Sequence, residues 1–138
     1  EMNPDFRWFV SEAHKRGVKE IIVRSNLTIL TANPKYNDLP EFFKENNVRV
    51  CSSLPFYSAD KTDRQRGEGV FKDSINGLKM LNKVGYGKEG SGLILDLVYN
   101  PTGAFLPGDQ MQLERDFKKE LTVWLLSPIF PSVAFLIF

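Results

Sequence analysis

Three short apolar runs divide the first hundred residues of the chain, and each passes into polar residues. The runs cover residues 20–25, 48–54 and 92–100. Apolar stretches of this length, bounded by polar or glycine-rich segments, are typical of buried strands. The polar positions at their ends are Arg24-Ser25-Asn26, Ser52-Ser53 and Tyr99-Asn100. The pattern therefore predicts strands whose carboxyl ends carry side chains able to bind a ligand.

Apolar residues at helical spacing occupy the segments before, between and after these runs. We expect helices over residues 3–17, 38–46, 70–85 and 109–121. Asn, Asp and Pro stand at their starts and Gly follows two of them, as helix capping favours. Residues 57–69 are polar and lack this spacing, so we expect a loop there.

Alternating helices and strands predict βαβ units and a parallel sheet. A sheet of only these strands would keep open edges, which favours part of a larger barrel or sheet. Ligands of such folds lie at the carboxyl ends of the strands. Ser and Asn also suit turns and helix caps, so a purely structural interpretation of the polar strand ends remains open.

Composition narrows the class of partner. The chain has 138 residues, 42% of them hydrophobic and 25% charged, with a net charge of +1. This balance does not favour nucleic acid or an anionic membrane, and we expect a small-molecule ligand instead. The single cysteine excludes an internal disulfide and favours the cytoplasm or another reducing compartment.

The C-terminal segment is unusual because residues 121–138 carry no charge. Its length just reaches that of a membrane span, but Pro128 and Pro131 would interrupt a helix. A strand-forming core segment is therefore favoured over a membrane anchor. We divide the chain into a core of residues 1–124 and an atypical apolar tail of residues 125–138.

Few residues suggest chemistry on their own. Arg64 and Arg66 precede a predicted helix start, where basic groups and free N–H groups suit an anion, unless the segment is a solvated loop. His14 is expected at the surface, and Cys51 as an inert buried thiol. The sequence shows no nucleophile–base arrangement and no zinc-ligand spacing, so we assign neither catalytic nor metal-binding residues.

Longer stretches carry a resemblance to a known family. The segment "VRSNLTIL" at residues 23–30 resembles the third strand of radical S-adenosylmethionine (SAM) enzymes. The segments "VRVCSSLP" and "RQRGEGVFKDSINGLKMLNKVGY" are similar to their fourth strand, loop and following helix. Together with "GYGKEGSGL" and "NPTGAFLPGDQ", residues 1–124 most closely resemble the arsenosugar-biosynthesis-type radical SAM proteins.

The resemblance implies a partial (β/α)6 barrel with parallel strands. It also implies SAM and a [4Fe–4S] cluster held by three cysteines as cofactors. Enzymes of this family cleave SAM to a 5′-deoxyadenosyl radical, here acting on a small metabolite such as an organoarsenical. The cofactor carries that chemistry, and the protein positions it.

Carried over position by position, the resemblance implies a set of SAM-binding residues. Glu1 would bind the amino group, Ser53 the methionyl part and Arg66 the carboxylate. Arg24, Ser25 and Asn26 would lie at the end of the third strand, and Asn100 near the adenosyl group or the substrate.

Some departures from the family pattern limit what this chain can do. The cysteine loop is missing, Cys51 stands elsewhere, Phe56 replaces a cysteine of some members, and the sequence diverges after Trp124. We therefore expect a fragment without the cysteine loop and the C-terminal domain, inactive alone. The alternative is a non-enzymatic α/β module that binds SAM or another small ligand.

Overall fold

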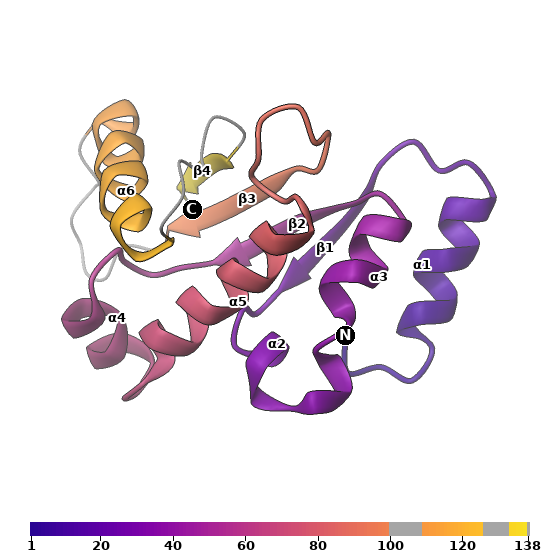
Figure 1. Cartoon of the computed structure of the whole chain (residues 1–138), viewed down its shortest axis with the longest axis horizontal. Helices are drawn as coiled ribbons and strands as arrows, with labels where there is room; N and C mark the ends of the chain where they lie inside the picture. Colours follow the sequence, from indigo (N-terminus) through magenta and orange to yellow (C-terminus); the bar gives the residue numbers. More distant parts are fainter. Residues whose placement is uncertain (100–108, 126–132, 138) are drawn as a thin grey trace.

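The computed structural model describes residues 1–99, 109–125 and 133–137. In chain order its elements are α1 (Phe6–Lys15), β1 (Ile21–Ser25), α2 (Ile29–Ala32), the 3-10 helix η1 (Pro34–Tyr36), α3 (Leu39–Glu45), β2 (Val48–Ser53), α4 (Ala59–Arg66), α5 (Val70–Val84), β3 (Leu95–Tyr99), α6 (Gln110–Leu125) and β4 (Val133–Ile137). The predicted alternation of helices and strands is confirmed, and the fold is mixed α/β (Figure 1).

The strands form one open parallel sheet in the order β1-β2-β3-β4. Ile21 pairs with Val48, Val50 with Leu95, and Leu95 with Val133. Each strand pairs with its neighbour in sequence, and helices make the crossovers, as expected for βαβ units. The carboxyl ends of β1, β2 and β3 therefore lie along one edge of the sheet.

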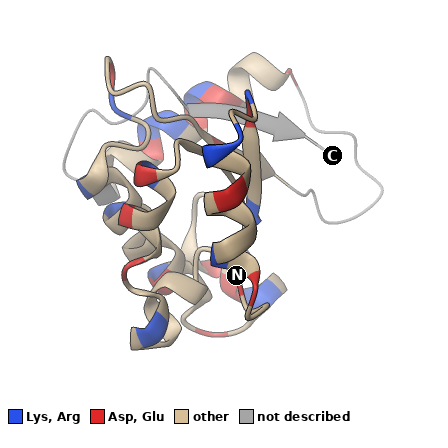
Figure 2. Cartoon of the chain, turned by 90° about the vertical axis from the view of Figure 1, so that its right-hand side faces the viewer, with Lys and Arg blue, Asp and Glu red and all other residues tan. Residues whose placement is uncertain are grey.

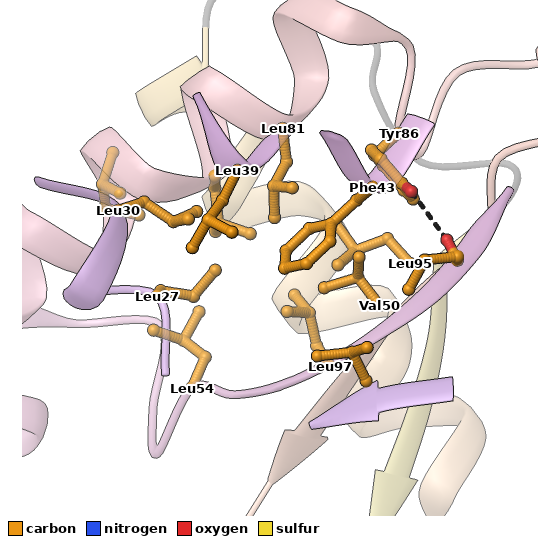
Figure 3. Packing of buried hydrophobic residues seen from close by; sticks show 14 of the residues in the cluster. Leu27, Leu30, Leu39, Phe43, Val50, Leu54, Leu81, Tyr86, Leu95 and Leu97 are labelled. Carbon is orange, nitrogen blue, oxygen red and sulfur yellow. Dashed lines mark hydrogen bonds between the residues drawn. The ribbon is translucent and has the colours of Figure 1, made fainter. Parts of the chain in front are cut away.

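One face of the sheet packs against the helices. Val23, Val50, Leu95 and Leu97 are buried in a single cluster with side chains of α3, α5 and α6. Figure 3 shows Phe43 and Leu81 directed toward Val50 and Leu95 from the helices above the sheet. Alternation along the strands means that Ile22, Arg24, Arg49, Cys51 and Asp96 lie on the other face.

An ion-pair cluster on that other face joins segments far apart in sequence. Asp96 is 2% exposed, and its two carboxylate oxygens accept from Arg49 Nε at 2.5 Å and Nη2 at 3.2 Å. Arg49 also donates to Glu20 at 2.9 Å. Elsewhere basic and acidic residues are interspersed over the helices, in keeping with the net charge of +1 (Figure 2).

The expected loop over residues 57–69 is wrong, because α4 occupies most of it. Of this helix only Thr62 is buried, and its hydroxyl donates to the Phe56 carbonyl at 3.0 Å. A helix that buries one small polar side chain has no apolar period. The sequence features that do favour a helix here are Asp60 in the first turn and Arg64 and Arg66 in the last, because their charges suit the helix dipole.

Smaller differences concern element boundaries. The third strand begins at Leu95 rather than at residue 92, because Gly90 and Gly92 have positive φ angles of 75° and 74°. Helix α6 extends to Leu125, four residues beyond the expected end. Part of the apolar tail forms β4, as expected of a strand-forming segment. Within the described residues, no helix is long and apolar enough to cross a membrane.

Candidate functional site

A pocket of about 200 Å³ opens at the carboxyl edge of the sheet. Its lining residues are Arg24, Ser25, Asn26, Cys51, Ser53 and Arg66. They come from the end of β1, the second half of β2 and the last turn of α4. The topology brings the first two groups together, and α4 adds an arginine from a third element. We call this hollow the carboxyl-edge pocket.

Ser25 supplies a polar atom that the fold leaves without a partner. The side chain is 5% exposed, and its Oγ makes no hydrogen bond. Ser52 Oγ is similarly buried and unpartnered, but Ser52 does not line the pocket. An unpaired buried hydroxyl costs free energy. Alternation along β1 places the Ser25 side chain on the helix-covered face with Val23, so Ser25 borders the pocket at the strand end while Arg24 projects from the opposite face.

Two arginines in the pocket lack counter-ions. Arg24 lies in β1 opposite Cys51, and Arg66 is the last residue of α4, where Gly67 at φ 110° turns the chain. Within the described part of the chain, neither guanidinium forms an ion pair or hydrogen bond, and no acidic residue lines the pocket. The pocket is therefore positively charged.

Asn26 stabilises a turn, which is the structural interpretation that the sequence had left open for the polar strand ends. Its Oδ1 accepts hydrogen bonds from the Thr28 N–H at 3.3 Å and the Thr28 hydroxyl at 3.1 Å. This arrangement stabilises the turn that follows β1. The amide nitrogen has no such bond, so Asn26 can serve the turn and still donate to a ligand in the pocket.

The start of α5 is not the free anion site that the sequence predicted. Asp63 Oδ2 accepts from the Gly69 N–H at 3.1 Å, and Oδ1 accepts from the Phe71 N–H at 2.8 Å. The protein's own carboxylate thus occupies the position that an external anion would take. Arg66 also lies in α4 rather than in a loop before α5, and it faces the carboxyl-edge pocket instead.

Cys51 lines the pocket but remains a poor nucleophile. The side chain is 9% exposed, and burial raises the pKa of its thiol, with the nearby Asp96 carboxylate adding to the rise. A thiol with a raised pKa stays protonated at neutral pH, and the thiolate is the reactive form. The interpretation of Cys51 as an inert buried thiol is therefore supported. His14 is exposed, as expected.

A [4Fe–4S] cluster does not fit the residues of this chain. Such clusters need several thiolates, and the sequence contains one cysteine. Among the described residues, no group of three or more His, Cys, Asp or Glu side chains could hold a metal ion. We therefore derive no step through a cluster bound to this chain.

One described residue of the predicted site, Glu1, is not brought into the pocket. Glu1 is half-buried, with an unpartnered Oε1, but it does not line the pocket. Asn100 lies outside the described residues. Sequence reasoning missed Cys51 as a lining residue, although strand alternation places it beside Arg24 and Ser53.

Comparison with models of known protein families and with curated proteins returned no match to this chain. The interpretation of the pocket therefore depends on its own residues and geometry.

Proposed function

We propose that the carboxyl-edge pocket binds the amino-acid part of SAM. In this proposal the chain is part of a radical SAM core whose open parallel sheet belongs to a partial (β/α)6 barrel. One observation carries the proposal. The residues Arg24, Ser25, Asn26, Ser53 and Arg66, which the family resemblance implies for SAM binding, line a single pocket.

The chemistry of the pocket suits a zwitterionic amino acid. A guanidinium binds a carboxylate through charge-assisted hydrogen bonds, and the hydroxyl of Ser53 can donate to it or accept from an ammonium group. The volume of about 200 Å³ lies below the roughly 300–1,000 Å³ of complete small-molecule sites. The pocket thus has room for part of SAM and leaves the adenosyl group to other residues.

The proposed reaction of the complete enzyme is cleavage of SAM to a radical that acts on a small metabolite such as an organoarsenical. The chain contributes binding groups to that reaction but not the thiolates of a cluster. On this proposal the 138-residue chain binds SAM and does not cleave it.

Titration calorimetry with SAM tests the binding. We expect saturable binding by the wild-type chain, weakened roughly tenfold or more by Arg66→Gln, because a hydrogen bond to a charged group contributes about 1.5–3 kcal/mol. Arg64→Gln is the matched control, since Arg64 lies in the same helix and outside the pocket. No binding by the wild type, or equal losses in both variants, would contradict the proposal.

Anaerobic reconstitution with iron and sulfide tests the second half of the proposal. We expect no stoichiometric cluster and no 5′-deoxyadenosine from SAM and a reductant, because one buried cysteine cannot replace several thiolates. A Cys51→Ser variant should behave like the wild type. Stoichiometric cluster formation by the wild-type chain would overturn this expectation.

A non-enzymatic binding module is the second candidate function. It is favoured by the combination of a polar pocket with a thiol that burial keeps protonated. Both candidates predict a bound small molecule, and they differ in its identity. Binding of other amino-acid zwitterions or small anions with the affinity of SAM or better would favour the module.

A further inference from the structure

We propose that the carboxyl-edge pocket holds two anionic groups at once, the carboxylate of SAM and an anionic group of a second small molecule. The second molecule is then a substrate that carries a carboxylate or an oxyanion. This inference rests on the proposed function, because it assigns SAM to one part of the pocket.

The pocket has an excess of positive charge. Arg24 and Arg66 both line it, and no Asp or Glu among the described residues does. Of the other arginines in the described chain, Arg7 contacts Asp38 at 2.6 Å and Arg16 contacts Glu12 at 2.9 Å, whereas Arg64 and Arg115 form no ion pair but lie outside the pocket. Arg49, on the same sheet face as Arg24, contacts both Asp96 and Glu20. Within residues 1–99, 109–125 and 133–137, the two guanidinium groups of this pocket thus have no counter-ion.

The charge of SAM itself also favours a second anion. SAM carries an ammonium group and a sulfonium group against a single carboxylate, so it is a net cation. Bound alone beside two arginines, it would satisfy one guanidinium and be repelled by the other. A second anion removes that repulsion and pairs the remaining arginine. Binding of SAM and of the anion should therefore strengthen each other.

The two arginines lie on different elements of the fold. Arg66 comes from α4, and by the family resemblance it takes the SAM carboxylate. Arg24 projects from β1 on the same sheet face as Cys51, which its backbone pairs with, and as Ser53. Ser25 also lines the pocket, but alternation along β1 places its side chain with Val23 on the helix-covered face. Arg24 thus offers an oxyanion a guanidinium group on a different element from the one that takes the SAM carboxylate.

The start of α5, the anion site that the sequence predicted, is already filled. A phosphate or carboxylate at the start of α5 would meet Asp63, which accepts hydrogen bonds from the Gly69 and Phe71 N–H groups. The negative charge of Asp63 excludes a further anion there. The pocket itself is the position that remains for it among these elements.

The experiment measures SAM affinity by calorimetry with and without inorganic phosphate, at constant ionic strength set with sodium chloride. We expect phosphate to strengthen SAM binding several-fold in the wild-type chain. In Arg24→Gln the affinity for SAM should no longer depend on phosphate, whereas Arg24→Lys should restore part of the dependence by keeping the charge. Arg64→Gln should respond to phosphate like the wild type, and thermal unfolding midpoints check that each variant is folded.

The possible outcomes separate this inference from the proposed function. If phosphate competes with SAM, or leaves its affinity unchanged, the pocket holds one anion only and the inference is wrong, while SAM binding stands. If phosphate binds and SAM does not, the proposed function is wrong, and the inference that rests on it is wrong as well. An undiminished phosphate effect in Arg24→Gln would also overturn the inference, because the second anion would then lie elsewhere.

Discussion

Tyr86 shows how a single polar atom is accommodated in the core. Its side chain is completely buried, and its hydroxyl donates to the Val48 carbonyl at 2.6 Å (Figure 3). The bond links the segment after α5 to the first residue of β2, 38 positions apart in sequence. Burial raises the pKa of Tyr86 above its ordinary value, because the phenolate would lose its hydration.

A Tyr86→Phe substitution should therefore reveal both the hydrogen bond and the buried phenol. At pH 7 we expect the variant to lose about 1–3 kcal/mol of unfolding free energy, because the Val48 carbonyl loses its donor. The unfolded tyrosine ionises near pH 10, and the folded one only at higher pH. Wild-type stability should consequently fall as the pH rises above about 10.

Urea unfolding at pH 7 and at pH 10.5 provides the measurement. Because Tyr86→Phe lacks the titrating phenol, the stability difference between wild type and variant should shrink at the higher pH. Tyr57, whose pKa burial also raises, is present in both proteins and cancels in the comparison. A difference that is the same at both pH values would show that Tyr86 does not couple folding to ionisation.

The burial or exposure of single side chains could be predicted from the sequence more readily than their hydrogen-bond and ion-pair partners. The buried Cys51 and the exposed His14 followed from their neighbours in the sequence. The missing partner of Ser25 and the pairing of Arg49 with Asp96 did not, because they depend on strand register. Register places Cys51 opposite Asp96, and no local pattern specifies it.

At the scale of elements, the junction between α4 and α5 depends on one carboxylate. Asp63 lies within α4, yet its side chain caps the first N–H groups of α5 through two hydrogen bonds. The turn between the helices has Gly67 and Gly69 at φ angles of 110° and 82°, which L side chains rarely adopt. The orientation of α4, and with it the position of Arg66, follows from this junction.

An Asp63→Ala substitution should lower the unfolding free energy by about 1–2 kcal/mol, the usual cost of losing a helix cap. It should also weaken SAM binding, because Arg66 would no longer be held at the pocket. Glu68→Ala is the control, since Glu68 is exposed in the same turn and has no partner among the described residues. Urea unfolding and calorimetry report the two effects, and an equal response of both variants would argue against the cap.

Elements with a strong apolar period could be predicted from the sequence, and those without one could not. Helix α5 buries Phe71, Ile75, Leu78 and Leu81 on one face, and its expected range was confirmed. Helix α4 buries only Thr62, so its helical nature was missed. The carboxyl-edge pocket was predictable in part for the same reason. The pocket residues of β1 and β2 lie at the ends of apolar runs that predict strands, whereas Arg66 was assigned to a loop.

At the scale of the whole molecule, the direction of the strands was predictable and the extent of the sheet was not. Alternating helices and strands imply parallel pairing, which the register of β1, β2 and β3 confirms. The apolar tail was expected to form a strand, but its sequence did not predict that this strand pairs with β3. Closure into a partial barrel likewise depends on how strands assemble, and it remains part of the proposal.

The ion-pair cluster of Glu20, Arg49 and Asp96 connects three consecutive segments of the sheet, and it supports a prediction at this scale. Arg49→Leu would leave the Asp96 carboxylate, only 2% exposed, without its partner. Removing one member of a buried ion pair costs about 3–5 kcal/mol, because the remaining charge is uncompensated. The double variant Arg49→Leu/Asp96→Leu should recover much of that loss, since it removes both charges together.

Arg16→Leu is the matched control for this pair of variants. Arg16 and Glu12 form an exposed pair, with side chains 74% and 30% exposed, and such pairs contribute at most about 1 kcal/mol. Urea unfolding of the four proteins should therefore rank Arg49→Leu lowest, with the double variant between it and the wild type. If Arg49→Leu costs no more than Arg16→Leu, solvent reaches Asp96 in solution and the sheet does not depend on this cluster. A loss in the double variant as large as in Arg49→Leu would instead mean that the two residues act through packing rather than charge.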